Sequence, residues 1–186
     1  MATVVVLNGT SSSGKTTLAR EFQELAPSRF LNFSIDSILQ ALPPSTTRSI
    51  AEGESIADLR LADLHAAYFA CVRQLATLGH DLVIDNAITS RFQAERLVEA
   101  VDGHRVLMVL VACSEDVLRK REHARGDRRM GMAVAQLPSI ARWLQYDLQI
   151  DTSVIPATDG ARAIVEALAQ QTGGAFERTC AALGTA

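Results

Sequence analysis

The stretch "VVVLNGTSSSGKTTLAR", residues 4–20, joins an apolar run to a helical pattern through a loop of glycine and hydroxyl residues. Four positions fit the pattern G-x-x-x-x-G-K-S/T, namely Gly9, Gly14, Lys15 and Thr16. Glycines let such a loop turn tightly, so its backbone N–H groups surround a phosphate chain while the next helix points its positive end at the same place. The sequence therefore predicts a phosphate-binding loop between a strand and a helix.

Residues of this loop form the predicted nucleotide site. The predicted nucleotide-binding residues are Gly9, Thr10, Ser11, Ser12, Ser13, Gly14, Lys15, Thr16 and Thr17. Lys15 would reach the β- and γ-phosphates of ATP, and the Thr16 hydroxyl would ligate Mg²⁺. GTP stays possible beside ATP. A glycine- and serine-rich turn with a solvated lysine is the alternative, which the placement between a strand and a helix disfavours.

Apolar runs alternate with helical patterns along the rest of the chain. Strands are expected over residues 3–7, 30–36, 81–86, 105–113 and 147–153. Helices are expected from Gly14 to about 25, then over 37–42, 58–78, 90–101, from Ser114, and over 157–171. Uninterrupted apolar strands are covered on both faces. The pattern predicts a five-stranded parallel α/β sheet in the order 2-3-1-4-5, within one domain over residues 1–186.

Composition excludes several functional classes. Apolar residues make up 48% of the chain and charged residues 21%, as in an average globular protein. The longest apolar run, residues 106–113, is too short to span a bilayer. With a net charge of −3, no basic face for nucleic acid is expected. We expect a cytoplasmic protein without membrane or nucleic-acid partners, whose oligomeric state stays open.

Two aspartates follow apolar strands near the predicted phosphate site. Asp85 in "LVIDN" is expected to hold Mg²⁺ together with Thr16, and an ordinary strand-end aspartate is the alternative. Asp36 in "FSIDS" is expected at the end of the neighbouring strand, where ligands of open α/β sheets bind. It would orient an alcohol and accept its proton as a general base. The alternative is a helix cap, for which Ser34 or Asp36 would serve.

A basic segment, residues 119–133, lies between two expected helices and contains Arg125, Arg128 and Arg129. Phosphoryl transfer spreads negative charge over three oxygens, which planar guanidinium groups stabilise when a lid closes. We therefore predict a lid, with Arg125 and Arg128 as catalytic residues beside Lys15 and Asp36, and Arg129 in the nucleotide site. A solvated helix face is the alternative. The irregular stretch 42–57 is expected to be a functional loop.

Together, "LNGTSSSGKT", "FSIDS", "LVIDN", "ARGDRRMGMA" and "YDLQIDTS" resemble the chloramphenicol phosphotransferase family of P-loop kinases over most of the chain. The resemblance implies a nucleoside-triphosphate-dependent O-phosphotransferase that inactivates a hydroxyl-bearing antibiotic, with Asp36 as its base. It also implies that Arg125 and Arg128 lie in the lid and that residues 150–153 lead into the nucleotide-base loop. The chain departs from the family where Asn86 follows Asp85, since paired aspartates are expected there, and over residues 37–60.

Two rival functions remain at the level of the sequence. A small-metabolite kinase of shikimate or gluconate type would need arginines beside its anionic substrate, and Arg48 and Arg60 are available. A nucleotide-hydrolysing switch or binding module would instead hydrolyse ATP without an acceptor. The favoured prediction is a kinase that transfers the γ-phosphoryl group of ATP to a hydroxyl group of an antibiotic such as chloramphenicol or a related natural product.

Overall fold

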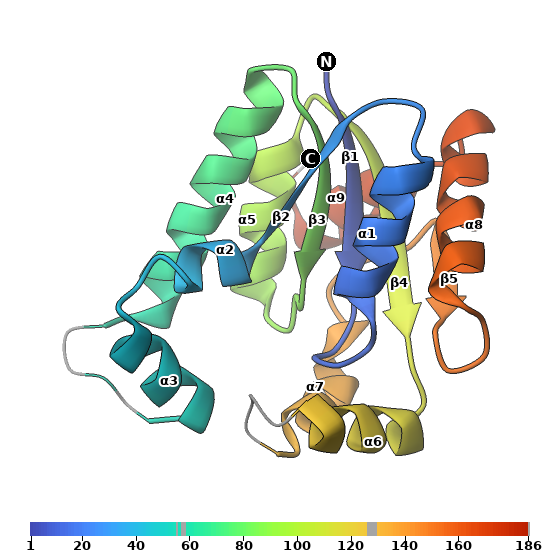
Figure 1. Cartoon of the computed structure of the whole chain (residues 1–186). Coiled ribbons are helices and arrows are strands. Elements are labelled where there is room, and N and C mark those ends of the chain that lie inside the picture. Colours follow the sequence, from blue (N-terminus) through green and yellow to red (C-terminus); the bar gives the residue numbers. More distant parts are fainter. Residues whose placement is uncertain (55, 57–58, 126–129, 186) are drawn as a thin grey trace.

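The computed structural model describes residues 1–54, 56, 59–125 and 130–185. Its strands form one parallel sheet in the order β2-β3-β1-β4-β5, as predicted. They are β1 (Thr3–Asn8), β2 (Phe30–Ser34), β3 (Asp81–Asn86), β4 (Arg105–Ala112) and β5 (Leu148–Asp151). Figure 1 shows all these strands running in the same direction, so their carboxyl ends meet along one edge of the sheet.

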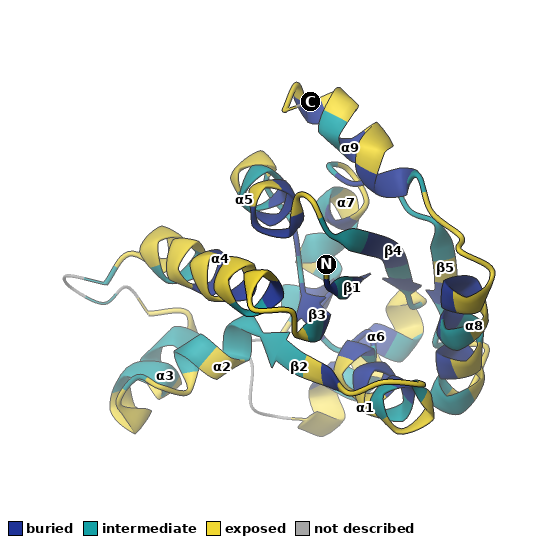
Figure 2. Ribbon diagram, turned by 90° about the horizontal axis from the view of Figure 1, so that it is seen from above, coloured by how far each residue is buried: buried dark blue, intermediate teal, exposed yellow. Residues whose placement is uncertain are grey.

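Helices cover both faces of the sheet. They are α1 (Lys15–Leu25), α2 (Ile35–Leu39), α3 (Pro44–Glu52), α4 (Leu61–Thr77), α5 (Arg91–Val101), α6 (Glu115–Arg125), α7 (Met132–Ile140), α8 (Ala157–Ala169) and α9 (Ala175–Leu183). In Figure 2, α1 and α8 lie on one side of the sheet, and α4, α5 and α9 lie on the other. Within the described residues, no helix has the length and apolarity needed to cross a membrane.

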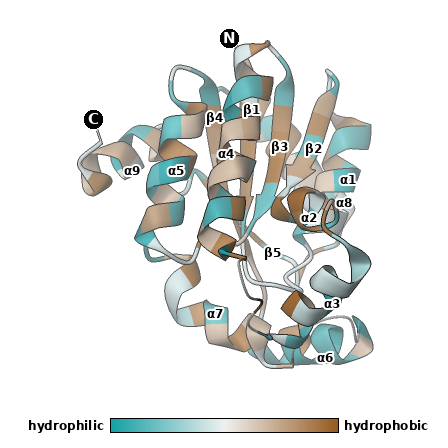
Figure 3. Ribbon diagram, turned by 90° about the vertical axis from the view of Figure 1, so that its left-hand side faces the viewer, coloured by the Kyte–Doolittle hydropathy of each residue, from teal (hydrophilic) through white to brown (hydrophobic). Residues whose placement is uncertain are grey.

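The central strand β1 shows why the sheet is buried on both faces. Val5 and Leu7 belong to the apolar cluster under α1 and α8, whereas Val4 and Val6 belong to the cluster under α4 and α5. Successive side chains of a strand point to opposite faces, so a continuous apolar run fills both cores. Figure 3 shows apolar residues along the central strands β1 and β3. The sheet therefore forms a rigid base for the residues at its carboxyl edge.

Two local differences from the sequence predictions concern the segment after β2. The strand ends at Ser34, because the Ser34 hydroxyl caps α2 by accepting a hydrogen bond of 3.1 Å from the backbone N–H of Asp36. The stretch predicted as a loop over residues 42–57 contains helix α3. Pro44 is its first residue, where the missing N–H costs nothing, and Gly53 ends it with a φ of 79°.

A buried amide fixes two connections to the end of β1. Asn8 is fully buried, and its Nδ2 donates hydrogen bonds of 2.7 Å to the carbonyl of Ile140 and to the hydroxyl of Tyr146. Its Oδ1 accepts a hydrogen bond of 2.8 Å from the backbone N–H of Ile88. Burial raises the pKa of Tyr146 to about 12, so its hydroxyl stays neutral and donates to Ile140. The end of α7 and the segment after β3 are thereby held beside the predicted site.

Candidate active site

The loop predicted to bind phosphate, which we call the phosphate-binding loop, lies between β1 and α1, where the sequence placed it. Gly14 precedes α1 with a φ of 90°, a left-handed conformation that glycine adopts without steric cost. A Cβ added at Gly9 would lie 2.5 Å from the carbonyl oxygen of Val111, so the loop passes too close to β4 for a side chain. These two glycines let the loop turn back on itself, and the positive end of α1 faces it.

The polar groups of this loop fit a bound phosphate chain. The hydroxyls of Ser11, Ser12 and Ser13 are buried without a hydrogen-bond partner among the described residues. Buried polar atoms are normally hydrogen-bonded, so hydroxyls in this position are suited to a polar ligand. The ammonium group of Lys15 is largely buried in the same place and donates a hydrogen bond of 2.8 Å to the carbonyl of Thr10.

Oxygen ligands suitable for Mg²⁺ meet next to Lys15. The hydroxyl of Thr16 donates a hydrogen bond of 2.6 Å to Oδ2 of Asp85, and Nζ of Lys15 lies 3.8 Å from Oδ1 of the same carboxylate. Hydroxyl and carboxylate oxygens are ligands that Mg²⁺ prefers. The neighbouring Asn86 accepts a hydrogen bond from the backbone N–H of Ala87, and its buried Nδ2 has no partner among the described residues.

Asp36 is the second residue of α2 and lines the same cleft as Lys15 and Asp85. It was predicted to end the strand, but β2 stops at Ser34, so Asp36 lies two residues beyond the strand. Ser34 rather than Asp36 caps the helix. The hydroxyl of Tyr68 on α4 donates a hydrogen bond of 3.0 Å to the carbonyl of Phe33, and their rings stack. This contact holds the end of β2, and hence α2, against α4.

The cleft has a volume of about 820 Å³ and divides into two parts. One part contains the phosphate-binding loop. We call the other part the acceptor half; its walls come from α2, α3, the start of α4 and the segment from the end of β3 to the start of α5. Its apolar lining residues are Ile35, Leu39, Ile50, Ala51, Leu61, Leu64 and Ala87.

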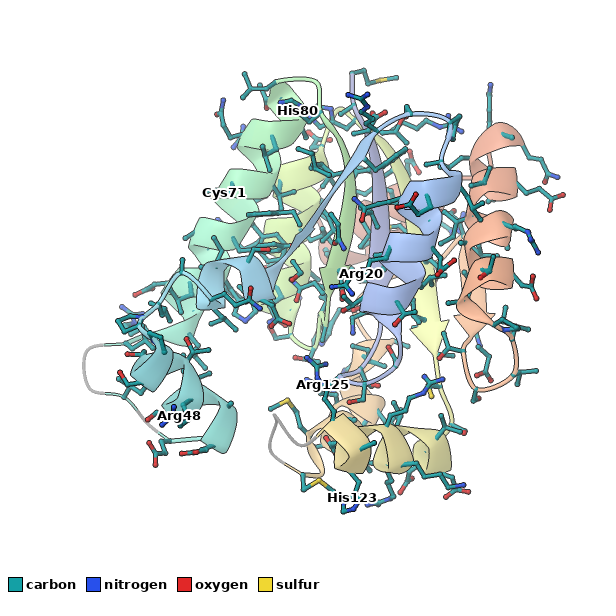
Figure 4. The ribbon with its side chains drawn as sticks, viewed as in Figure 1. Arg20, Arg48, Cys71, His80, His123 and Arg125 are labelled. Atoms are coloured by element: carbon teal, nitrogen blue, oxygen red, sulfur yellow. The ribbon has the colours of Figure 1, made fainter. Side chains whose placement is uncertain are left out.

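The two arginines that would serve an anionic acceptor do not line this cleft. Arg48 is exposed on α3, and Figure 4 shows it at the outer end of the molecule, away from the phosphate-binding loop. Arg60 has a side chain that is 79% exposed, and its Nε lies 3.7 Å from a carboxylate oxygen of Asp63. Among the described residues of the acceptor half, none is basic apart from the imidazole of His65.

Part of the predicted lid is helical. Residues 119–125 belong to α6, and Arg125 at its end lines the cleft, between α6 and the phosphate-binding loop in Figure 4. The predicted residues Arg128 and Arg129 lie outside the described residues. The buried carboxylate of Glu122 accepts hydrogen bonds of 2.6 Å and 3.0 Å from the backbone N–H groups of Gly131 and Ala133. This carboxylate joins α6 to the start of α7.

Two residues that the sequence analysis missed also contact the loop or its neighbours. Arg121 donates hydrogen bonds of 2.8 Å and 3.0 Å to the carbonyl and hydroxyl oxygens of Thr152, whose hydroxyl donates to the carbonyl of Ser13. Gln136 on α7 accepts a hydrogen bond of 2.7 Å from the backbone N–H of Ser11. The i, i+4 spacing of Arg121 and Arg125 on one helix was the available signal for Arg121.

The chain is similar to known proteins along most of its length. A protein of Mycobacterium tuberculosis (strain H37Rv) named "Putative O-phosphotransferase Rv2636" is 32% identical over 188 residues, which cover 88% of this chain and 80% of that protein. Solved structures of the same fold include a gluconokinase from Sinorhizobium meliloti 1021, with a TM-score of 0.61 and 22% identity over 91% of this chain and 97% of that one. They also include the Deinococcus radiodurans tunicamycin resistance protein, with a TM-score of 0.63 and 17% identity over 90% and 96% of the two chains.

These solved structures share the fold of this chain. The family model described as "Chloramphenicol phosphotransferase-like protein" matches residues 2–169. A match over this length identifies the family and the class of enzyme. The chain is a phosphotransferase with a P-loop kinase fold and belongs to the chloramphenicol phosphotransferase-like family.

Proposed function

We propose that the protein transfers the γ-phosphoryl group of ATP to a hydroxyl group of an uncharged, largely apolar natural product, such as chloramphenicol or a related antibiotic, and so confers resistance to it. The observation that carries this proposal is the acceptor half of the cleft. Apolar side chains of α2, α3 and α4 line it among uncharged polar groups, and Arg48 and Arg60 lie away from it. An anionic acceptor would leave its charge unpaired there, which costs far more than burying a neutral alcohol.

Asp36 is the proposed general base of the reaction. Its carboxylate would accept the proton of the alcohol as the alcohol oxygen forms a bond to the γ-phosphorus and the bond from that phosphorus to ADP breaks. Lys15 and Arg125 would neutralise the negative charge that gathers on the phosphoryl oxygens. Thr16 and Asp85 would hold Mg²⁺, which supplies further charge neutralisation at the phosphates when it is bound.

The shape of the cleft favours an acceptor over simple hydrolysis. A nucleotide-hydrolysing switch needs space for one water molecule beside the γ-phosphate, whereas the cleft extends past Asp36 along α2, α3 and α4. A wall that contains several apolar side chains gains free energy by covering the body of an organic molecule. It also keeps water away from the reacting phosphate once that molecule is bound.

A mass-spectrometric screen tests this function. The protein would be incubated with ATP, Mg²⁺ and, in separate reactions, chloramphenicol, tunicamycin, gluconate or shikimate. We expect a gain of one phosphoryl group on chloramphenicol or tunicamycin, and ADP release that is slow until the acceptor is added. Transfer to gluconate or shikimate alone would contradict the uncharged acceptor. Rapid ADP release with no phosphorylated product would contradict the acceptor kinase.

A further inference from the structure

The amide of Gln93 is fixed in orientation at the start of α5. Its Oε1 accepts hydrogen bonds of 2.8 Å and 3.2 Å from the backbone N–H groups of Thr89 and Ser90. Ser90 caps the helix in return, by accepting a hydrogen bond from the backbone N–H of Gln93. This reciprocal arrangement is a capping box, and it occupies the oxygen of the Gln93 side chain. Its NH₂ group is therefore the end that faces the cleft.

The NH₂ group of Gln93 lies against the imidazole of His65 on α4. Its Nε2 is 3.2 Å from Nε2 and 3.5 Å from Nδ1 of the ring. An amide NH₂ group only donates hydrogen bonds, so the ring nitrogen that receives one of its hydrogens must carry a lone pair. In a neutral imidazole the other nitrogen then carries the hydrogen. Gln93 thus favours the neutral imidazole, which carries one N–H group.

His65 lines the acceptor half of the cleft together with apolar residues of α2 and α4. The hydroxyl groups of two threonines that line the same part of the cleft donate their hydrogens to oxygens of the protein itself. Thr47 donates to the carbonyl oxygens of Leu39 and Pro43, and Thr89 donates to Oε1 of Gln93. Burial lowers the pKa of His65, in agreement with a neutral ring. The imidazole therefore presents a neutral hydrogen-bond donor to a molecule in the apolar part of the cleft.

We propose that His65 determines acceptor specificity: the N–H group of its neutral ring donates a hydrogen bond to a second oxygen of the alcohol, such as a carbonyl, amide or ether oxygen. This inference rests on the proposed function, and it narrows the acceptor to a neutral alcohol that carries such an oxygen. A donor that loses its partner in an apolar site costs free energy, so alcohols without this oxygen bind less tightly. An alcohol that carries an ammonium group at this point would bind less tightly, because the ammonium group and the ring N–H are both hydrogen-bond donors.

Kinetics of three variants test the role of His65. His65→Phe keeps a planar ring without a donor, and His65→Gln keeps one group that accepts from Gln93 and one that donates. His80→Leu is the matched control, because His80 is exposed in the turn after α4, far from the cleft in Figure 4. The acceptor used is chloramphenicol or tunicamycin, whichever the parent protein phosphorylates. Both compounds suit the test because both carry amide carbonyl oxygens.

We expect His65→Phe to raise the KM for the acceptor about tenfold, the usual worth of one hydrogen bond, with kcat and the KM for ATP changed by less than about threefold. His65→Gln and His80→Leu should stay within about threefold of the parent in all three constants. An unchanged acceptor KM in His65→Phe would overturn the proposal. The proposal would also be overturned if His65→Gln raised the acceptor KM as much as His65→Phe does. Since glutamine keeps an N–H donor, the loss of the donor would then not explain the weaker binding.

A measurement on the parent protein covers the case in which His65→Phe does not fold. In ring-nitrogen NMR spectra with a non-hydrolysable ATP analogue and Mg²⁺, the N–H proton of His65 should move downfield when the acceptor is added. A signal that does not move would overturn the proposal although the protein transfers phosphate. If the parent protein phosphorylates neither chloramphenicol nor tunicamycin, the proposed function fails first, and the specificity proposal fails with it.

Discussion

The hydroxyl of Thr16, in the first turn of α1, donates a hydrogen bond of 2.6 Å to Oδ2 of Asp85 at the end of β3. The two residues are 69 positions apart in the chain and meet because β1 and β3 are neighbours, with Leu7 opposite Asp85 in the register. Both side chains are of the kinds that ligate Mg²⁺, and the packing of the sheet against α1 places them together. The fold would therefore supply both ligands of the proposed metal site with little rearrangement.

Asp85→Asn should raise the Mg²⁺ concentration needed for half-maximal transfer by at least about tenfold, because a neutral amide binds a hard cation less strongly than a carboxylate. The rate of transfer would be measured against Mg²⁺ at constant ATP. Asp81→Asn is the matched control from the other end of β3, where the carboxylate accepts hydrogen bonds from Thr3 and Ser28. Equal Mg²⁺ dependence in Asp85→Asn and the parent would remove Asp85 from the metal site.

Lys15→Ala should lower the transfer rate by roughly 10²- to 10³-fold, because the backbone donors of the loop alone leave the charge on the β- and γ-phosphates poorly neutralised. The chain contains one other lysine, Lys120, which is exposed on α6 and serves as the control in Lys120→Ala. Initial rates and ATP affinity would be measured on both variants. Transfer at the parental rate in Lys15→Ala would refute the role of this loop.

Asp36→Asn should lower transfer to the alcohol by roughly 10²- to 10⁴-fold, the usual worth of general-base assistance. ATP affinity and Tm should stay near those of the parent, because Ser34 caps α2. Ser34→Ala gives the opposite pattern, with a loss of about 1 kcal/mol in the free energy of unfolding and transfer largely retained. Near-parental transfer in Asp36→Asn would show that another group takes the proton.

Arg125→Ala should lower kcat at least about tenfold and change ATP affinity less, because a guanidinium group at the end of α6 acts on charge that develops in the transition state. Arg119→Ala is the matched control on the same helix, since Arg119 is exposed and paired with Glu115. Steady-state kinetics with ATP varied would separate the two effects. A raised KM for ATP at constant kcat would mean that Arg125 contributes to binding alone.

Gln93→Glu should raise the pKa of His65, because a carboxylate in place of the NH₂ group stabilises the imidazolium while the capping box is kept. In the parent, burial lowers that pKa below 6.5. The folded state then binds fewer protons than the unfolded state, so the free energy of unfolding falls as the pH drops below 6.5 toward the folded-state pKa.

Histidine NMR titrations of Gln93→Glu and the parent protein would measure the change in the pKa of His65. Chemical denaturation at several pH values would show that the loss of stability at low pH becomes smaller in the variant. An identical pKa in both proteins would mean that the amide of Gln93 does not contact the ring.

The sequence by itself determined the phosphate-binding loop, the five strands and the place of Asp85. Each of these depends on residues that are close together in the chain. Glycines at fixed spacing specify the turn of the loop, and β-branched apolar runs specify buried strands. The strand order was also predicted correctly, together with the resemblance to the family. The roles of Lys15, Asp36 and Arg125 stay predictions that the variants above would test.

Only the tertiary structure decided which side chains share the acceptor half of the cleft. His65 and Gln93 are 28 residues apart, and Gln136 and Ser11 are 125 apart, so no local pattern relates them. Arg48 and Arg60 looked equally available to an anionic substrate, yet the packing of α3 and α4 leaves them exposed. A local pattern specifies which backbone conformation a segment adopts, whereas the direction of an exposed helix face depends on what the whole helix packs against.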